Sequence, residues 1–182
     1  MNGWQGIKRV DGNSLMSWGS QIQLKPSDKI LVNYSTFIGS DAPDSSRKIR
    51  YFHNLYGIFQ LTGKLALTTG FDIGTEQKSK GSNQYNRWYS PVLILQISPN
   101  TKTNFGARLE YYNDANEVII KTGTPNGFKT WAYSINYDYL ITHNAVWRVE
   151  GRRLSAKDKT FEKEGMPVNN NFSLTTSLAI SF

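Results

Sequence analysis

Apolar and polar side chains alternate with a period of two over much of this sequence, and no other pattern constrains the fold as strongly. In residues 65–74, Leu67 and Phe71 fall on one face of an extended chain, whereas Gly70 and Asp72 fall on the other. Such alternation is typical of β-strands that separate two environments, and it predicts an all-β chain of about ten strands. Four expected strands are regular and six are less so: residues 65–74, 104–111, 131–139 and 172–182, then 3–9, 14–25, 29–40, 48–62, 85–98 and 144–155.

The expected connections fall into two classes that alternate along the chain. The short turns are rich in turn-forming residues: Lys25-Pro26-Ser27-Asp28, Thr62-Gly63, Pro99-Asn100-Thr101 and Thr142-His143. The others are long, polar and charged: residues 41–47, 75–84, 113–127 and 156–171. Bacterial outer-membrane barrels have short periplasmic turns and long extracellular loops. The pattern therefore predicts an antiparallel up-and-down transmembrane β-barrel with its long loops outside the cell.

The composition excludes several other classes of protein. No segment approaches the roughly 18–20 consecutive apolar residues that a spanning helix needs, so a helical membrane protein is excluded. The chain has no Cys, and hence no disulfide framework and no thiolate metal site. The net charge is +7, but the basic residues of 157–163 are interleaved with acidic ones, which argues against nucleic-acid binding. Residues 1–9 do not have the pattern of a secretory signal, so we expect a mature or truncated chain.

Aromatic side chains make up 13% of the sequence and indicate how such a barrel would be oriented. Alternation places two sets of them on the outward face, as expected for girdles at the two membrane interfaces. The set near the short turns is Phe59, Phe105, Tyr139, Trp147 and Phe182. The set near the long loops is Phe71, Tyr89, Tyr111, Trp131 and Phe172.

A soluble β-sandwich or ligand-binding barrel would also alternate, with its apolar face as the core. The expected strands of about 11 to 15 residues are long for a sandwich, in which about five or six is typical. We therefore favour the membrane barrel and keep the soluble ligand-binding barrel as the less favoured alternative.

Residues with catalytic or metal-binding chemistry are sparse. The two histidines are His53, beside an aromatic run, and His143, in a tight turn, which is too little for a triad or a metal cluster. The inward carboxylates of Glu110, Asp138 and Glu150 each have an arginine neighbour on the same face, so a charge network explains them better than acid/base catalysis. We assign no catalytic residue, no metal site and no cofactor, and predict that the protein is not an enzyme.

The inward polar residues predict a water-filled lumen. The expected pore-lining residues are Asp72, Arg108, Glu110, Asn136, Asp138, Arg148, Glu150 and Arg152. Opposed charges across such a lumen would create a transverse field that sieves solutes by size and charge. Because three arginines face four carboxylates in this set, the sequence predicts no ion preference.

Five motifs carry a resemblance to a known family. They are Gly70-Phe71-Asp72-Ile73-Gly74, Trp88-Tyr89-Ser90-Pro91-Val92, Arg108-Leu109-Glu110-Tyr111-Tyr112, Thr122-Gly123-Thr124-Pro125-Asn126-Gly127-Phe128 and the terminal run Thr175-Thr176-Ser177-Leu178-Ala179-Ile180-Ser181-Phe182. From about Trp18 to Phe182 the chain resembles the OmpL-like outer-membrane β-barrel porins. The resemblance implies passive diffusion of small solutes or ions across the outer membrane of a Gram-negative bacterium.

Members of that family are about twice as long, so the resemblance implies that residues 1–182 form a single domain that is the C-terminal part of a longer barrel. The expected partners are outer-membrane lipid, small solutes and the barrel-assembly machinery, which would read Phe182 in the C-terminal strand. Homo-oligomerisation stays open, and no nucleic acid is expected. If ten strands instead close a small barrel, side chains could fill the lumen. The protein would then be a structural, adhesive or enzymatic scaffold without a channel.

Overall fold

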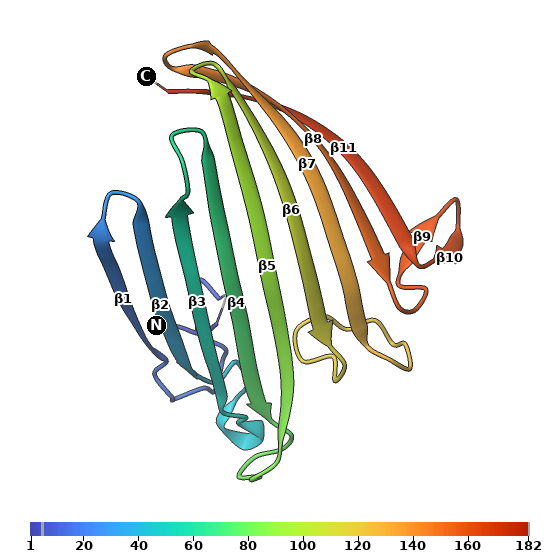
Figure 1. The fold of residues 1–182 in the computed structure, drawn as a ribbon. Coiled ribbons are helices and arrows are strands. Elements are labelled where there is room, and N and C mark those ends of the chain that lie inside the picture. The colour runs from blue at the N-terminus through green and yellow to red at the C-terminus, as the bar shows by residue number, and fades with distance from the viewer. Residues whose placement is uncertain (5, 182) are drawn as a thin grey trace.

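The computed structural model describes residues 1–4 and 6–181, which form a large curved β-sheet (Figure 1). The helical content of this part is one short 3-10 turn, η1 (Asp44–Ser46). No helix among these residues is long and apolar enough to cross a membrane. Phe182, to which we assigned an assembly signal and a place in the girdle, lies outside the described residues.

Nine strands form one sheet in which each strand pairs antiparallel with the next strand along the chain. They are β1 (Trp18–Ser27), β2 (Ile30–Gly39), β3 (Arg50–Gln60), β4 (Leu65–Gln77), β5 (Tyr85–Asn100), β6 (Thr103–Asp114), β7 (Phe128–Thr142), β8 (Ala145–Ala156) and β11 (Asn170–Ile180). The short strands β9 (Phe161–Lys163) and β10 (Met166–Val168) form a separate hairpin in the connection between β8 and β11. The predicted all-β, antiparallel, up-and-down order is confirmed.

The two classes of connection lie at opposite ends of the sheet (Figure 1). The short turns, at residues 28–29, 61–64, 101–102 and 143–144, form the upper end in Figure 1. The long connections, at residues 40–49, 78–84, 115–127 and 157–169, lie at the other ends of the strands. The predicted alternation of short and long connections is therefore confirmed, and we call these the short-turn end and the long-loop end.

Residues 3–4 and 6–9, which the structure describes, contain no strand, so the prediction of a strand at residues 3–9 was wrong. Trp4 is held on the sheet in another way: its backbone N–H donates to Asp41 Oδ1 at 2.8 Å, and its ring lies 4.2 Å from that of Phe52. This segment therefore lies on the sheet without joining its edge. The hairpin of β9 and β10 was also unexpected, since residues 156–171 were interpreted as a loop.

Strand β5 is the longest, with 16 residues, and it runs through Pro91. Proline lacks a backbone N–H, so it interrupts a ladder on one side of its strand. Pro91 is in register with Phe71 of β4, whereas neither Ser90 nor Pro91 has a register partner on β6. The sheet thus accommodates the proline by a gap in one ladder. The strand also extends to Asn100, into the turn predicted at residues 99–101.

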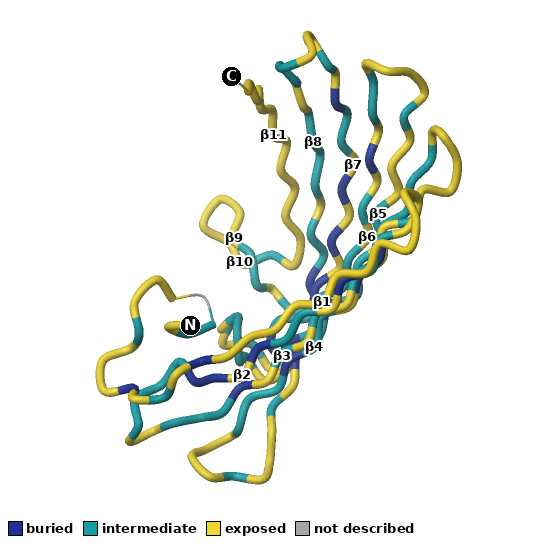
Figure 2. The backbone as a smooth tube through the Cα atoms, turned by 90° about the vertical axis from the view of Figure 1, so that its left-hand side faces the viewer, coloured by how far each residue is buried: buried dark blue, intermediate teal, exposed yellow. Residues whose placement is uncertain are grey.

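The sheet is curved and open. Figure 2 shows the strands bending around a concave side on which the N-terminal segment lies. The edge strands β1 and β11 are not paired with each other, so the described residues form no closed barrel. Every residue of both edge strands is exposed.

Burial in this sheet is inverted relative to a soluble protein. Among the described residues, four hydrophobic side chains are buried, compared with ten polar or charged ones. On the outer face, by contrast, Ile135 is 69% exposed although β7 lies inside the sheet. Soluble monomers rarely expose a contiguous apolar patch of more than roughly a few hundred Å². The two faces therefore suit an apolar surrounding on the convex side and a polar one on the concave side.

Candidate functional site

The concave face, which we call the inner face, carries most of the polar strand residues. In-register residues of neighbouring strands point to the same side of a sheet. One such row runs through Asn54, Asp72 and Ser90 on β3, β4 and β5. All eight residues predicted to face inward lie on this face: Asp72, Arg108, Glu110, Asn136, Asp138, Arg148, Glu150 and Arg152.

The arginines of the central inner face are paired with carboxylates. Arg108 Nη2 lies 2.6 Å from Glu110 Oε2, and Arg152 Nη2 lies 3.6 Å from the same oxygen. On β7 and β8, Arg148 Nε donates to Asp138 Oδ1 at 2.6 Å, and a second guanidinium nitrogen contacts the other carboxylate oxygen. Charge-assisted bonds of this kind hold planar groups in fixed orientations. The predicted charge network is therefore present between Glu110, Asp138 and their arginine neighbours, but Glu150, which was also expected in it, makes no salt bridge with a described residue.

Two inner-face carboxylates, Asp72 and Glu150, make no salt bridge with a described residue. Asp72 accepts a hydrogen bond from Asn54 Nδ2 at 2.6 Å, but no described basic group lies within 4.0 Å of it. Glu150 is in register with Asn136 and makes no salt bridge or hydrogen bond through its side chain with any described residue. An unpaired carboxylate on an open polar face is available to attract a dissolved cation.

The short-turn half of the inner face contains a shallow polar depression of about 270 Å³. Arg148 and Asp138 form part of its wall, and Glu150 lies at its side. Amide side chains complete its polar lining: Gln96, Asn104 and Asn136. The depression offers hydrogen-bond donors and acceptors together with both signs of charge, which suits hydrated small solutes.

At the long-loop end, the N-terminal segment covers the inner face of β2 to β5. Phe37, Phe52, Gly74 and Trp88 form one register row across these four strands. The ring of Trp4 sits edge-on against this row, 5.1 Å from Phe37, 4.2 Å from Phe52 and 6.4 Å from Trp88. We call the rings of Trp4, Phe37, Phe52 and Trp88 the aromatic cluster. It gives the inner face a hydrophobic core at one end only.

An ion network lies next to the aromatic cluster. Arg50 is 7% exposed and contacts Asp41 Oδ2 and Glu76 Oε2, each at 2.5 Å. Its guanidinium carbon also lies 5.6 Å from the ring centroid of Trp88. Arg50 thus joins the β2–β3 loop, strand β4 and the aromatic cluster, so that N-terminal segment and sheet form one packed unit.

The β6–β7 loop is ordered by two carboxylates. Asp114, which is fully buried, accepts backbone hydrogen bonds from Val118, Ile119 and Ile120. Glu117 accepts from the hydroxyl and the backbone N–H of Thr122, and these bonds hold the pKa of Glu117 below its usual range. The loop lies beside Arg50 and Glu76, where it lines a cavity of about 380 Å³. The β6–β7 loop therefore extends from β6 towards the inner face of β3 and β4.

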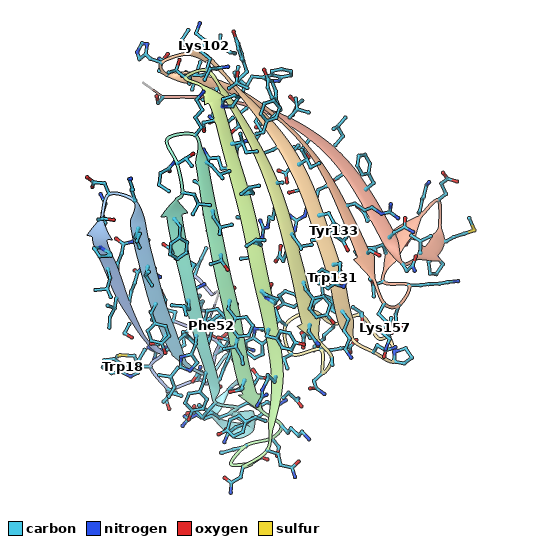
Figure 3. The ribbon with its side chains drawn as sticks, viewed as in Figure 1. Trp18, Phe52, Lys102, Trp131, Tyr133 and Lys157 are labelled. Carbon is cyan, nitrogen blue, oxygen red and sulfur yellow. The ribbon has the colours of Figure 1, made fainter. Side chains whose placement is uncertain are left out.

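The outer face carries two belts of aromatic rings in contact. Near the long loops, centroid distances of 4.8 to 6.3 Å connect one belt across β4 to β7: Phe71, Tyr89, Tyr111, Trp131 and Tyr133. Near the short turns, a second belt joins Phe105, Tyr137 and Trp147 at 5.2 and 6.3 Å. Figure 3 shows Trp131 and Tyr133 side by side on β7. Phe59, Tyr139 and Phe172 are also on the outer face, although these distances do not link them to either belt.

The histidines take no part in the inner face. His53 is on the outer face, where its Nδ1 lies 2.7 Å from the hydroxyl of Tyr34 and the two rings stack. His143 is in the turn between β7 and β8. Among the described residues there is also no group of three or more potential metal ligands.

The sequence matches the family described as "Putative beta-barrel porin-2, OmpL-like" over residues 1–182, the whole chain. The chain belongs to this porin family. No curated protein and no solved structure matches the chain at a significant level. Membership of the porin family confirms the predicted resemblance. It also favours an outer-membrane location and a role other than catalysis.

Sequence reasoning missed the part of this porin-family chain that surrounds Trp4. In the structure Phe52 and Trp88 lie on the inner face, but the alternation contained no signal that Trp4 would cover them. Arg50 was likewise not singled out, because its partners Asp41 and Glu76 are 9 and 26 residues away. A glycine at position 74, in register with the large ring of Trp88 on the next strand, is a signal that could have indicated a packed site here.

Proposed function

We propose that this sheet is part of the wall of an outer-membrane pore through which small solutes and ions diffuse passively. The observation that carries the proposal is the inverted burial: apolar side chains cover the convex face and paired charges cover the concave face. A membrane barrel needs this arrangement, because lipid surrounds it and water fills it. The two aromatic belts then mark the two interfaces, and the long loops face the outside of the cell.

Closure of such a barrel requires more strands than these nine. Strands β1 and β11 both run from the long-loop end to the short-turn end, since eight antiparallel pairings separate them. Direct pairing of the two edges would therefore be parallel. An up-and-down antiparallel barrel needs an odd number of additional strands between them, which gives an even total, as bacterial barrels have. We place these strands in the same polypeptide, outside residues 1–182.

The charged inner face would line the lumen. Salt bridges hold Arg108, Arg148 and Arg152 against the wall, so these side chains would shape the lumen without moving into it. Solutes would pass along a wall with alternating charges and amide groups, and selection would be by size and charge. No covalent step is needed, which agrees with a non-enzymatic role.

The experiment is single-channel recording in planar bilayers with the full-length protein, folded in detergent. Discrete, voltage-insensitive conductance steps in potassium chloride are expected. A folded and inserted protein without conductance would contradict the pore and favour a non-channel barrel, in which the N-terminal segment and loops fill the lumen. A protein that stays dispersed without detergent would contradict the membrane location itself.

A further inference from the structure

Three basic residues lie on the outer face at the long-loop end of β7 and β8. Lys129 and Trp131 alternate with inward residues on β7, and Arg153 is in register with Tyr133 and Phe172. Lys157 follows β8 directly, and its backbone N–H donates to the carbonyl of Lys129 at 2.8 Å. This bond continues the ladder, so the two lysines lie opposite each other on neighbouring strands. We call Lys129, Arg153 and Lys157 the basic patch.

The basic patch has no acidic partner among the described residues. None of its three side chains makes a salt bridge, in contrast to Arg108, Arg148 and Arg152 on the inner face. Asp158, the next carboxylate in the chain, instead accepts two hydrogen bonds of 2.9 Å from Asn126. These bonds, together with the nearby Lys157, hold the pKa of Asp158 below its usual range. The patch therefore presents a net positive charge, without a salt bridge, beside an apolar surface.

Aromatic rings surround the basic patch on the side towards the middle of the sheet. Trp131 neighbours Lys129, whereas Tyr133 and Phe172 flank Arg153 on either side. In Figure 3, Trp131 and Tyr133 lie near the long-loop end of β7, with Lys157 beyond them. A ligand that satisfies both features needs an anionic head that reaches the cations and apolar chains that lie against the rings.

We propose that the basic patch binds the phosphorylated headgroup of a lipid in the outer leaflet. Two adjacent lysines match a phosphate monoester, which carries a charge of about −1.5 to −2 at neutral pH. Phosphate accepts charge-assisted hydrogen bonds from both ammonium groups, while Arg153 contacts a second phosphate or the adjoining polar atoms. The acyl chains extend over Tyr133 and Phe172. This site rests on the membrane location in the proposed function, but not on the pore.

The test uses native mass spectrometry of the full-length protein in neutral detergent, titrated with lipid A that carries two phosphate monoesters. The dephosphorylated lipid serves as the comparison. We expect the phosphorylated form to bind at least about tenfold more tightly, because a hydrogen bond between charged groups contributes about 1.5 kcal/mol or more. Equal binding of the two forms would overturn the proposal.

A matched pair of double variants locates the site. Lys129→Gln/Lys157→Gln removes two charges from the basic patch, and Lys64→Gln/Lys102→Gln removes two from the short turns at the opposite end, where Figure 3 shows Lys102. The first pair is expected to weaken binding at least about tenfold and the second to leave it unchanged. Equal effects of both pairs, or no effect of the first, would overturn the site. Circular dichroism of each variant checks that it is folded.

The same experiment separates this proposal from the pore. A protein that conducts but shows no preference for the phosphorylated lipid contradicts the basic patch alone. A protein that is soluble without detergent and binds neither lipid contradicts the membrane location, and the site with it.

Discussion

Among single residues, the inner face carries two kinds of charged side chain: those in salt bridges and those without one. Each of Arg108, Arg148 and Arg152 lies against a carboxylate, so their positive charges are largely compensated at the wall. Asp72 and Glu150 have no such partner. We therefore expect the carboxylates without a salt bridge to favour cations in the proposed lumen, although the sequence alone, with three arginines and four carboxylates, predicted no preference.

Replacement of Glu150 tests this point. Glu150→Gln should shift the permeability ratio of the proposed pore towards anions about twofold, since one charge several Å from the permeating ion in water contributes about 0.5 kcal/mol. The reversal potential in a potassium chloride gradient measures the ratio. Glu162→Gln, in the β9–β10 hairpin, removes the same charge away from the inner face and should have no effect. A shift of equal size in both variants would show that Glu150 is not on the path of the ions.

Gly74 tests the packing of the aromatic cluster. A Cβ atom at this position would lie 1.9 Å from Cζ2 of the buried Trp88 ring, so alanine must displace that ring. Gly74→Ala should lower the free energy of unfolding by about 1–3 kcal/mol, as overpacking does. Gly63→Ala is the control, because no atom lies within 4 Å of its added Cβ. Unfolding in guanidinium, followed by tryptophan fluorescence, measures both, and equal stabilities would contradict the packing.

At the scale of elements, the sequence predicted strands well and the N-terminal segment badly. Alternation depends on neighbours in the chain, so β4, β6 and β7 could be located to within a few residues. The position of Trp4 depends on Phe52 and Asp41, which lie far away in sequence, and periodicity carries no information about such contacts. The order within the β6–β7 loop also escaped prediction, because it depends on the hydrogen bonds of two carboxylates, Asp114 and Glu117.

The N-terminal segment should be held in place mainly by its tryptophan ring. Trp4→Ala removes the contacts with Phe37 and Phe52, and loss of a half-buried ring should cost about 2 kcal/mol of local stability. Trypsin cleavage after Lys8 and Arg9 should then become at least about tenfold faster. Trp18→Ala, on the exposed edge strand β1, should leave the cleavage rate unchanged. Cleavage that is equally fast in the unmodified protein would mean that the ring does not hold the segment.

The β2–β3 loop should keep its structure in mild acid. Hydrogen bonds from Arg47 and Ser14 lower the pKa of Asp44 from 3.8 to about 2. Because the folded pKa lies below the unfolded one, the contribution of Asp44 is complete above about pH 4 and is lost as the pH falls towards 2. Hydrogen exchange of residues 40–49 between pH 6 and pH 2 measures it. Loss of protection already at pH 5 would contradict the contacts of Asp44.

At the scale of the whole molecule, the open sheet, the inverted burial and the family membership support one account. The convex face with its two belts suits a bilayer, and the concave face with its paired charges suits water. Nine strands with parallel edges need further strands to close an antiparallel barrel. The sequence predicted the two faces and the two ends, but strand alternation cannot show whether the outermost strands meet.

Which face of the sheet meets the water of the pore can be tested directly. The chain has no Cys, so single cysteines can be introduced at Glu150 on the inner face and at Leu174 on the outer face. A charged, membrane-impermeant thiol reagent is then added during single-channel recording. The reagent should change the conductance of Glu150→Cys pores and leave that of Leu174→Cys pores unaltered. A conductance change in Leu174→Cys pores without one in Glu150→Cys pores would contradict the assignment of the two faces.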